Sequence, residues 1–228
     1  MDAQPLGELL PDIGWALLNG FLSTTIVLAL LPYLEHAFHV TTRIRLVELA
    51  DFRHPLLRRL MLEAPGTYHH SLMLSNLAER AAEAIGADSL LCRVGAYFHD
   101  VGKLVRPEAF QENQAHFNTP DALTPGLSSL VITAHVKEGV RLAEEHGLPE
   151  EIIQFIPMHH GTSLIHHVYL KAQEEFAAEH VEEAKYRYPG PKPQSRETAI
   201  VMLADACEAA SRTLDDPAAG RIAEMVSR

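Results

Sequence analysis

The longest uninterrupted apolar stretch of the chain lies close to its N-terminus. Residues 13–34 read IGWALLNGFLSTTIVLALLPYL, with no charged residue between Asp12 and Glu35. A helix needs roughly 20 mostly apolar residues to cross the hydrocarbon core of a bilayer. The pattern therefore predicts a transmembrane helix that contacts membrane lipid through residues 13–34.

Charged residues are distributed unevenly around this stretch. Glu8 and Asp12 precede it, whereas five arginines follow it: Arg43, Arg45, Arg53, Arg58 and Arg59. Because positively charged flanks stay on the cytoplasmic side, we expect a protein of the cell membrane whose globular part is cytoplasmic. The alternative is a buried core helix or an uncleaved signal sequence. The N-terminus MDAQPLGELLPD, however, has neither a basic start nor a small-residue cleavage site.

The rest of the chain has apolar positions with a helical period rather than the alternation of strands. Pro65 and Gly66 predict a turn, after which Thr67 caps a helix that ends at Gly86. Apolar side chains three and four residues apart place His70 on the inward face of this helix. The complete predicted face is His70, Met73, Leu74, Leu77, Ala78, Ala81 and Ile85.

The next predicted helix begins after Asp88, which can cap it, and carries Phe98 inward. It extends to His99 and Asp100 before Gly102 loosens the backbone. Beyond a polar stretch, we expect four more helical runs. These are a helix capped by Ser128 that carries His135 and closes at Gly147, a helix from Pro149 to His159 and His160, a run from Leu164 to His180, and a last helix opened by Ser195 that carries Asp205.

The pattern as a whole predicts an all-α protein in two parts. Residues 1–45 form the transmembrane helix and the start of a linker, and residues 46–228 form one helical domain. The net charge of -11 argues against a partner such as polymeric nucleic acid. Only Cys92 and Cys207 occur, so we expect neither a disulfide framework nor a thiolate metal site.

Histidine is unusually frequent, with 14 copies. The helical phases bring seven potential metal ligands towards one interior: His70, His99, Asp100, His135, His159, His160 and Asp205. Seven ligands exceed the needs of one ion, and imidazole with carboxylate suits first-row transition metals better than calcium. We expect two divalent ions, iron or manganese, with cobalt and zinc as alternatives. A bridging carboxylate allows such ions to lie about 3.5–4 Å apart and activate a shared water.

Other histidines lack this pattern. We assign no chemistry to His36, His39, His54, His116, His146 and His180. His69 is adjacent to His70 and faces about 100° away on the helix, so at most it supports a ligand. His166 and His167 repeat the His-His doublet, but Gly161 interrupts the helix before them and they need not point inward.

Six ordered segments resemble a known family. They are HPLLRRLMLEAPGTYHHSLMLSNLAERAA, YFHDVGK, RPEAFQENQ, HVKEGVRLAEEHGLP, FIPMHHGTS and AIVMLADACEAASR. The set is similar to the cytoplasmic domain of the seven-transmembrane HD phosphodiesterases, which hydrolyse cyclic di-AMP. The family also carries earlier membrane helices, a large extracytoplasmic domain and a longer C-terminus. We therefore expect this chain to be a fragment or a reduced relative with an HD-domain helical bundle.

The resemblance implies a role for each matched residue. His70, His99, Asp100 and Asp205 would bind one ion, and Asp100 would bridge to a second ion. The ligands of this second ion would be His135, His159 and His160. Lys103 would assist phosphate binding or stabilise charge, although a surface lysine is an equal interpretation from the residues alone. Asp100 and Lys103 are thus the catalytic candidates.

The resemblance also implies the reaction. A hydroxide activated by two metal ions would attack a phosphodiester of a cyclic dinucleotide, most directly cyclic di-AMP, and release linear pApA. The choice of adenine as the base of the substrate rests on the resemblance alone. The related cyclic di-GMP enzymes usually have a GYP element after their HD ligands, whereas the corresponding stretch here reads HHGTS. Two alternatives remain: an HD phosphohydrolase of another nucleotide or alarmone, such as guanosine tetraphosphate, and a non-catalytic membrane-bound HD sensor. Oligomerisation is possible, and the sequence does not decide it.

Overall fold

The computed structural model of the chain describes residues 6–38, 40–116, 123–176, 181–212 and 221. Within these ranges the regular elements are α-helices and short 3-10 helices, and β-type pairing is confined to an isolated bridge between Leu164 and Arg187. The prediction of an all-α protein is therefore confirmed. The chain divides into two units, residues 1–42 and 43–228, so the division falls three residues before the predicted one.

The N-terminal unit is built on one helix, α1 (Leu6–Phe38). Its segment Leu9–Glu35 is long and apolar enough to cross a membrane, judged by length and composition. One polar side chain within it is satisfied locally, since the Thr25 hydroxyl donates to the Phe21 carbonyl oxygen at 2.8 Å. Such internal satisfaction is what a helix in an apolar medium requires.

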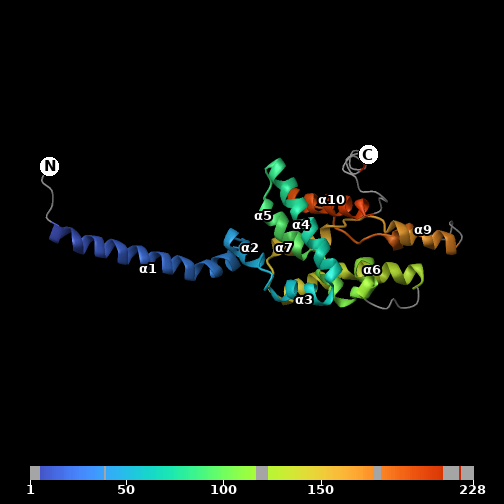
Figure 1. The fold of residues 1–228 in the computed structure, drawn as a ribbon, viewed down its shortest axis with the longest axis horizontal. Coiled ribbons are helices and arrows are strands. Elements are labelled where there is room, and N and C mark those ends of the chain that lie inside the picture. The colour runs from blue at the N-terminus through green and yellow to red at the C-terminus, as the bar shows by residue number, and fades with distance from the viewer. Residues whose placement is uncertain (1–5, 39, 117–122, 177–180, 213–220, 222–228) are drawn as a thin grey trace. The chain divides into compact units, whose positions relative to one another are not determined.

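The second unit is a bundle of helices (Figure 1). Its α-helices are α2 (Arg43–Leu49), α3 (Pro55–Glu63), α4 (Pro65–Ile85), α5 (Ser89–Phe98), α6 (Pro125–Glu145), α7 (Glu150–Ile153), α8 (Phe155–Met158), α9 (His166–Glu175) and α10 (Arg196–Ser211). Its 3-10 helices are η1 (Val101–Val105), η2 (Pro107–Ala109), η3 (Gln111–His116) and η5 (Glu183–Tyr186). Helices α4, α5 and α10 pack against one another, while α6 packs against η1 and α9.

Helix α4 begins at Pro65 with Ala64 as its N-cap, three residues before the predicted cap, so the prediction that Thr67 caps it was wrong. Thr67 is fully buried because η3 packs onto the first turn of α4. Its hydroxyl lies 3.1 Å from Glu112 Oε1 and accepts from Asn113 Nδ2 at 2.9 Å. Gly66 allows this approach, since a Cβ there would lie only 2.0 Å from the Glu112 carbonyl oxygen.

The buried face of α4 differs from the predicted one. Met73, Leu77 and Ile85 are exposed, so their inward placement was wrong. The buried positions include His70 but are otherwise mostly small side chains: Thr67, Ser71, Leu74, Ser75, Ala78 and Ala82. Small side chains let α5 and α10 approach α4 closely, and this close packing selects the face.

Helix α5 starts as predicted, because the Asp88 carboxylate accepts from the Leu91 backbone N–H at 3.0 Å. It ends at Phe98, one residue before His99, and η1 then redirects the chain. Gly102 in η1 was expected to loosen the backbone. A Cβ there would lie 1.8 Å from the His135 carbonyl oxygen, so the glycine instead permits close packing of η1 on α6.

Two other predicted helices differ from the observed ones. Helix α6 begins at Pro125 with Thr124 as its N-cap, so Ser128 lies inside the helix. The predicted helix from Pro149 to the His-His doublet is two short helices that break at Gln154. Pro157 explains the break, because it has no N–H to donate to the carbonyl of residue 153 and its ring crowds that carbonyl.

The remaining helices follow the prediction more closely. Helix α10 begins after Ser195, as predicted, and the Ser195 hydroxyl accepts from the Thr198 N–H at 3.1 Å within a capping box. The predicted run from Leu164 is shorter at its start, since α9 begins at His166. It also ends earlier than the predicted His180, since α9 closes at Glu175 and Phe176 has an extended backbone.

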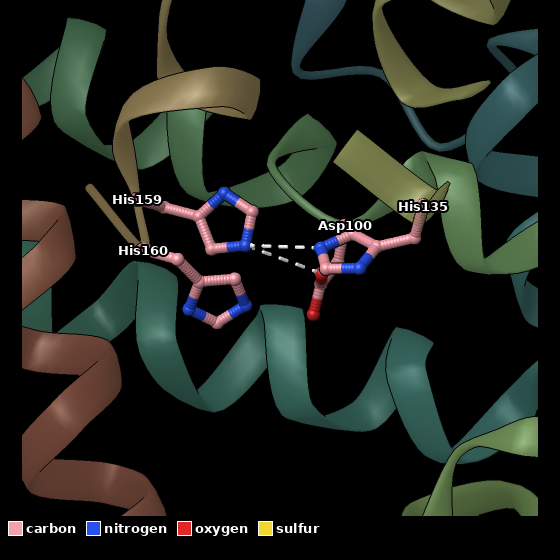
Figure 2. A group of neighbouring side chains, drawn as sticks. All are labelled: Asp100, His135, His159 and His160. Carbon is pink, nitrogen blue, oxygen red and sulfur yellow. Dashed lines mark hydrogen bonds and ion pairs between the residues drawn. The ribbon is translucent and has the colours of Figure 1, made fainter. Parts of the chain in front are cut away.

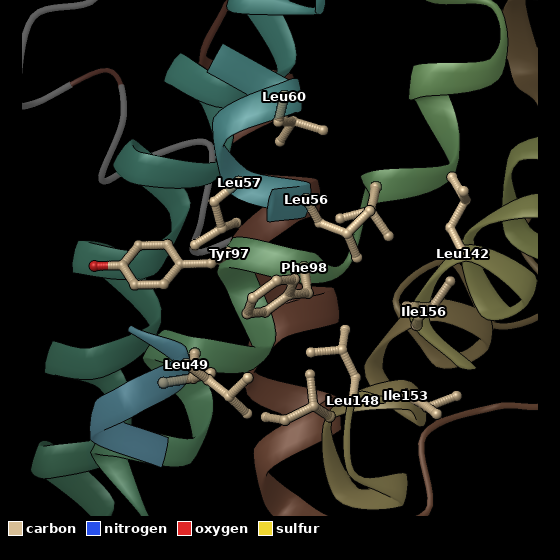
Figure 3. Packing of buried hydrophobic residues seen from close by; sticks show 14 of the residues in the cluster. Leu49, Leu56, Leu57, Leu60, Tyr97, Phe98, Leu142, Leu148, Ile153 and Ile156 are labelled. Carbon is tan, nitrogen blue, oxygen red and sulfur yellow. The ribbon is translucent and has the colours of Figure 1, made fainter. Parts of the chain in front are cut away.

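The largest core cluster holds the segment that carries His99 and Asp100 (Figure 3). Phe98 is fully buried at the end of α5, among leucines from α2 and α3 and the side chains of Leu142 and Ile156. Removing such a buried ring costs about 3–5 kcal/mol. Helices α2 and α3 lie in the stretch expected to be a linker, and they contribute leucines to this core. The core in turn fixes the end of α5.

Candidate metal centre

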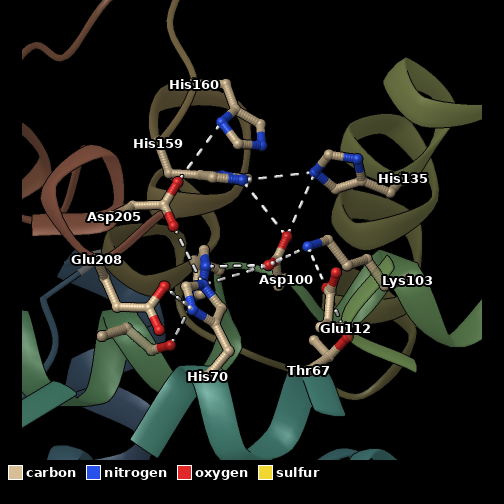
Figure 4. Close-up of polar contacts among 12 residues, drawn as sticks. Thr67, His70, Asp100, Lys103, Glu112, His135, His159, His160, Asp205 and Glu208 are labelled. Carbon is tan, nitrogen blue, oxygen red and sulfur yellow. Dashed lines mark hydrogen bonds and ion pairs between the residues drawn. The ribbon is translucent and has the colours of Figure 1, made fainter. Parts of the chain in front are cut away.

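The seven predicted ligands come from five places in the fold, and all lie around one interior position (Figure 4). Asp100 lies at the centre of this group. Six of the seven side chains are buried, and His160 is half-buried. They are His70 on α4, His99 and Asp100 after α5, His135 on α6, His159 and His160 after α8, and Asp205 on α10.

The two carboxylate oxygens of Asp100 face different partners. Oδ1 lies 3.4 Å from His135 Nε2 and 3.5 Å from His159 Nε2. Oδ2 lies 3.2 Å from His99 Nε2 and 3.8 Å from His70 Nε2. Potential ligand atoms accordingly form two groups that share Asp100: Asp100 with His135, His159 and His160 (Figure 2), and Asp100 with His70 and His99.

Main-chain carbonyl groups orient three of the imidazoles. Nδ1 of His99 lies 2.7 Å from the Ala96 oxygen. Nδ1 of His135 lies 2.5 Å from the Ile132 oxygen, and Nδ1 of His159 lies 2.7 Å from the Ile156 oxygen. Because a carbonyl only accepts, each Nδ1 carries the proton and each Nε2 turns a lone pair inward. Metal-binding histidines are commonly held in this way.

These inward atoms fit a cation. The Nε2 atoms of His135 and His159 lie 3.4 Å apart, so in the neutral rings two lone pairs face each other. Among the described residues, His99 Nε2 and Asp100 Oδ1 are buried with no hydrogen-bond partner. Buried polar atoms without a partner are costly, and a bound metal ion removes that cost. The donor set of imidazole and carboxylate suits first-row transition metals.

His70 is held differently, by carboxylates. Its Nδ1 donates to Glu208 Oε2 at 3.0 Å and its Nε2 lies 3.1 Å from Asp205 Oδ1. Glu208 also accepts from Arg212 Nε at 2.8 Å. Glu208 was not predicted from the sequence, although its position three residues after Asp205 puts it one helical turn along the same face.

The pKa values of His70 and His135 are shifted in opposite directions. Burial alone would lower the pKa of His70, but hydrogen bonds to Asp205 and Glu208 raise it to about 9. Burial dominates at His135 and lowers its pKa to about 3. Burial would raise the pKa of Asp100, yet the Lys103 ammonium and the surrounding imidazoles hold that pKa well below its usual range.

Lys103 is part of the interior network rather than a surface lysine. Its Nζ lies 2.8 Å from Asp100 Oδ2 and 2.7 Å from Glu112 Oε1, and only 12% of its side chain is exposed. Burial would lower its pKa, but Asp100 and Glu112 raise it, so Lys103 carries its charge. Sequence reasoning missed Glu112, although it lies within the segment RPEAFQENQ that carried the resemblance.

Tyr188 is a further neighbour that the sequence did not single out. Its ring stacks on His160, with centroids 4.0 Å apart and planes at 27°. His160 Nδ1 in turn lies 3.7 Å from Asp205 Oδ2. The loop before α10 thus covers one edge of the centre, and its aromatic content, YRYPGPKPQ, was the available signal.

The other histidines lie apart from the centre where the structure describes them. His69, His166 and His167 are exposed. His54 caps α3 by accepting from the Leu56 N–H at 3.3 Å, and His146 Nδ1 donates to the Leu142 oxygen at 2.8 Å. His39 and His180, to which the sequence assigned no chemistry, lie outside the described residues, as do the side chains of His36 and His116.

Comparison with known proteins identifies the family of the chain. The HD domain family model matches residues 67–210, more than half of the chain. The chain is 45% identical over 209 residues to the cyclic-di-AMP phosphodiesterase PgpH of Bacillus subtilis, covering 91% of this chain and 29% of that protein. It is equally 45% identical over 215 residues to PgpH of Listeria monocytogenes, covering 94% and 30%. The chain thus spans under a third of the length of these relatives.

A solved structure is also similar. The crystal structure of the L. monocytogenes PgpH HD domain in complex with cyclic-di-AMP shares 46% identity with this chain at a TM-score of 0.73. The alignment covers 78% of this chain and 83% of that one. Sequence identity and fold agree, and the chain belongs to the HD domain family.

Proposed function

We propose that this chain is a metal-dependent phosphodiesterase that hydrolyses a cyclic dinucleotide, with cyclic di-AMP as the substrate and linear pApA as the product. One observation carries the proposal: each oxygen of the buried Asp100 carboxylate faces a separate set of imidazole nitrogens. This geometry suits two ions that share one bridging carboxylate. The similar L. monocytogenes domain, which was crystallised with cyclic-di-AMP, supports the choice of substrate.

The residues divide between two ions in this proposal. His70, His99, Asp100 and Asp205 hold one ion, and Asp100, His135, His159 and His160 hold the other. Iron or manganese is the proposed metal, with cobalt and zinc as the alternatives that the same donors accept. A pair of such cations lowers the pKa of a bound water and neutralises negative charge on a phosphoryl group.

The protein itself supplies positioning and charge. Lys103 fixes the orientation of Asp100 through the 2.8 Å contact and adds a buried positive charge where a phosphate would bind. Asp205 contacts a histidine of each ligand group. Its Oδ1 lies 3.1 Å from His70 Nε2, and its Oδ2 lies 3.7 Å from His160 Nδ1. Because these groups are buried, their electrostatic effect on a bound phosphate is stronger than it would be in water.

We further propose that α1 anchors the protein in the cell membrane and that the HD domain lies in the cytoplasm. The length and composition of Leu9–Glu35 support the anchor, and the arginines that follow it support the orientation. Limited proteolysis of right-side-out and inverted vesicles tests this. The HD domain should be cleaved only in inverted vesicles, and cleavage in right-side-out vesicles would contradict the orientation.

The enzymatic proposal is tested with the detergent-solubilised chain loaded with manganese or iron. Metal content and hydrolysis of cyclic di-AMP, cyclic di-GMP, guanosine tetraphosphate and GTP are measured for the wild type, Asp100→Asn and Glu144→Gln. Glu144→Gln is the control, because Glu144 is exposed and the substitution removes one carboxylate distant from the centre. We expect release of pApA by the wild type and the control only. Hydrolysis of GTP or the tetraphosphate alone would favour the nucleotide alternative, and bound metal without hydrolysis would favour a sensor.

A further inference from the structure

Helix α2 has apolar side chains on two opposite faces. Leu46 and Leu49 belong to the largest core cluster and are 4% and 1% exposed. Ile44 and Val47, about one helical turn apart, are 55% and 61% exposed. At about 100° per residue, the exposed pair lies on the side of the helix opposite the buried pair. The core therefore explains the inner face of α2 but not its outer face, which consists of Ile44 and Val47.

Positive charge borders this outer face. Arg43 is exposed next to Ile44 and has no hydrogen bond or ion pair with any residue that the structure describes. Glu48 also borders the face, but it accepts from Arg45 Nη1 at 3.3 Å, which offsets its negative charge. Residues 43–59 contain five arginines and two acidic residues, whereas the whole chain has a net charge of -11. The segment that includes α2 thus suits an anionic partner.

The covalent chain limits where this face can lie. The candidate membrane span ends at Glu35, and α2 begins at Arg43. The chain between these two residues reaches at most about 28 Å even when fully extended. If α1 anchors the protein as proposed, α2 stays within this reach of the bilayer, and the cytoplasmic leaflet carries anionic lipids. The chain itself therefore brings a lipid surface, rather than an acidic protein, to the outer face of α2.

We propose that the outer face of α2 docks on the anionic surface of the bilayer, with Ile44 and Val47 among the headgroups and Arg43 paired with lipid phosphate. This inference rests on the proposed membrane anchor. An amphipathic helix at a bilayer surface buries its apolar face about 5–10 Å into the boundary between headgroups and acyl chains. Helix α2 packs on α5, and Leu49 shares a core cluster with Phe98. The docked helix thus connects the bilayer with the core that fixes the end of α5.

Tryptophan fluorescence of the full chain in vesicles of brominated lipid tests the proposal, because bromine quenches tryptophan on contact. Trp15 in α1 is the one tryptophan of the chain, so the wild type reports on α1. Val47→Trp in a Trp15→Phe background reports on α2. Leu170→Trp in the same background is the control, because Leu170 is 45% exposed on α9, at the other end of the second unit from α2 (Figure 1).

The vesicles contain phosphatidylglycerol and phosphatidylcholine, with bromine near the headgroup end of the acyl chains. We expect at least about twofold quenching of Val47→Trp and no quenching of Leu170→Trp. Adding Arg43→Glu to Val47→Trp, or using phosphatidylcholine alone, should remove about half of the quenching or more. Lys171→Glu, a charge reversal at an exposed position of α9, should remove none.

The wild type separates failure of the docking from failure of the anchor. Unquenched Trp15 would refute the anchor and the docking together. Quenched Trp15, with Val47→Trp quenched no more than Leu170→Trp, would overturn the docking and keep the anchor. A blue shift of Val47→Trp emission without quenching would indicate a protein partner, such as a second copy of the chain, and would overturn the lipid surface. Equal quenching with and without Arg43→Glu would overturn the anionic surface as the occupant.

Discussion

The two sides of Asp100 use the same ligand type but hold it in different ways. On the His135 side, the Nδ1 atoms of His135 and His159 donate to carbonyl oxygens of the preceding turn. On the His70 side, Nδ1 of His99 likewise donates to a carbonyl oxygen, but Nδ1 of His70 donates to the Glu208 carboxylate. Main-chain carbonyls fix ring orientation without adding charge, whereas a carboxylate also makes the imidazole more basic. The comparison predicts two metal sites of unequal character.

This difference has a consequence for metal loading. In the metal-free protein His70 has a pKa of about 9 and is protonated at neutral pH, whereas His135, with a pKa of about 3, is neutral. Binding of a metal on the His70 side therefore releases a proton, while the His135 side is ready to bind. The His135 side should fill first as metal is added at pH 7.

The largest effect is expected from Asp100→Asn, because Asp100 is common to both sides. The amide keeps the shape but removes the charge that faces four imidazoles and Lys103. Loss of several kcal/mol of charge stabilisation corresponds to a fall in kcat/KM for cyclic di-AMP of about a thousandfold or more. Metal analysis should show fewer than two ions per chain. Two tightly bound ions and near wild-type activity in Asp100→Asn would show that the sides are independent of this residue.

Gly102→Ala should disturb the His135 side next most strongly. The added Cβ would lie 1.8 Å from the His135 carbonyl oxygen, so α6 and η1 must separate. We expect about 3 kcal/mol of destabilisation, measured by urea unfolding, and weaker metal binding on the His135 side. Gly126→Ala is the control, since a Cβ there meets nothing within 4 Å. Equal stability of both variants would mean that this packing does not position His135.

Glu208→Gln should weaken only the His70 side. The amide oxygen still accepts from His70 Nδ1 but carries no charge, so we expect metal affinity of one of the two sites to fall about tenfold. Competition with a fluorescent chelator measures both affinities. Glu79→Gln is the matched control, because Glu79 is partly buried and pairs with Arg93 far along α4 from the ligands. A loss shared equally by both sites would contradict the division of the centre into two sides.

The smallest effect concerns the pH dependence of stability of the metal-free protein. The folded pKa of His70, about 9, exceeds its unfolded value of about 6.5. Its stabilisation is therefore complete below pH 6.5 and is lost as pH rises to about 9. His135 has a lowered folded pKa of about 3, so stability also falls as pH drops below 6.5 because the unfolded chain takes up the proton.

Thermal unfolding in the presence of a chelator measures this dependence. We expect shifts of a few degrees on each side of a maximum near pH 6.5. His70→Gln should flatten the alkaline limb alone. His135→Gln should flatten the acid limb between about pH 6.5 and 5, above the range in which carboxylates titrate. A melting temperature that rises between pH 6.5 and 9 would contradict the assigned pKa of His70.

Sequence reasoning was most successful where a local rule decides the structure. Side-chain caps at Asp88 and Ser195 depend on residues within one turn, and both were confirmed. It failed where packing between distant segments decides. Thr67 is buried by η3, some 45 residues away, and not free to cap α4. Pro157 was a missed local signal for the break between α7 and α8.

The candidate site shows the same limit. Positions with a recognisable pattern, such as His99 next to Asp100, could be found from the sequence. The residues that hold the ligands could not, because their partners are remote: Glu208 meets His70 from 138 positions away. Glu112 contacts Lys103, and Tyr188 stacks on His160, only when the chain is folded. No periodic pattern of residues in the sequence indicates such supporting contacts.

The central claim is that two metal ions share Asp100. Crystals of the manganese-loaded chain, measured by anomalous diffraction at the manganese absorption edge, test it most directly. We predict two anomalous peaks about 3.5–4 Å apart, one between Asp100 and the Nε2 atoms of His135 and His159, the other between Asp100 and the Nε2 atoms of His70 and His99. A single peak, or peaks that do not both lie within bonding distance of Asp100, would contradict the account.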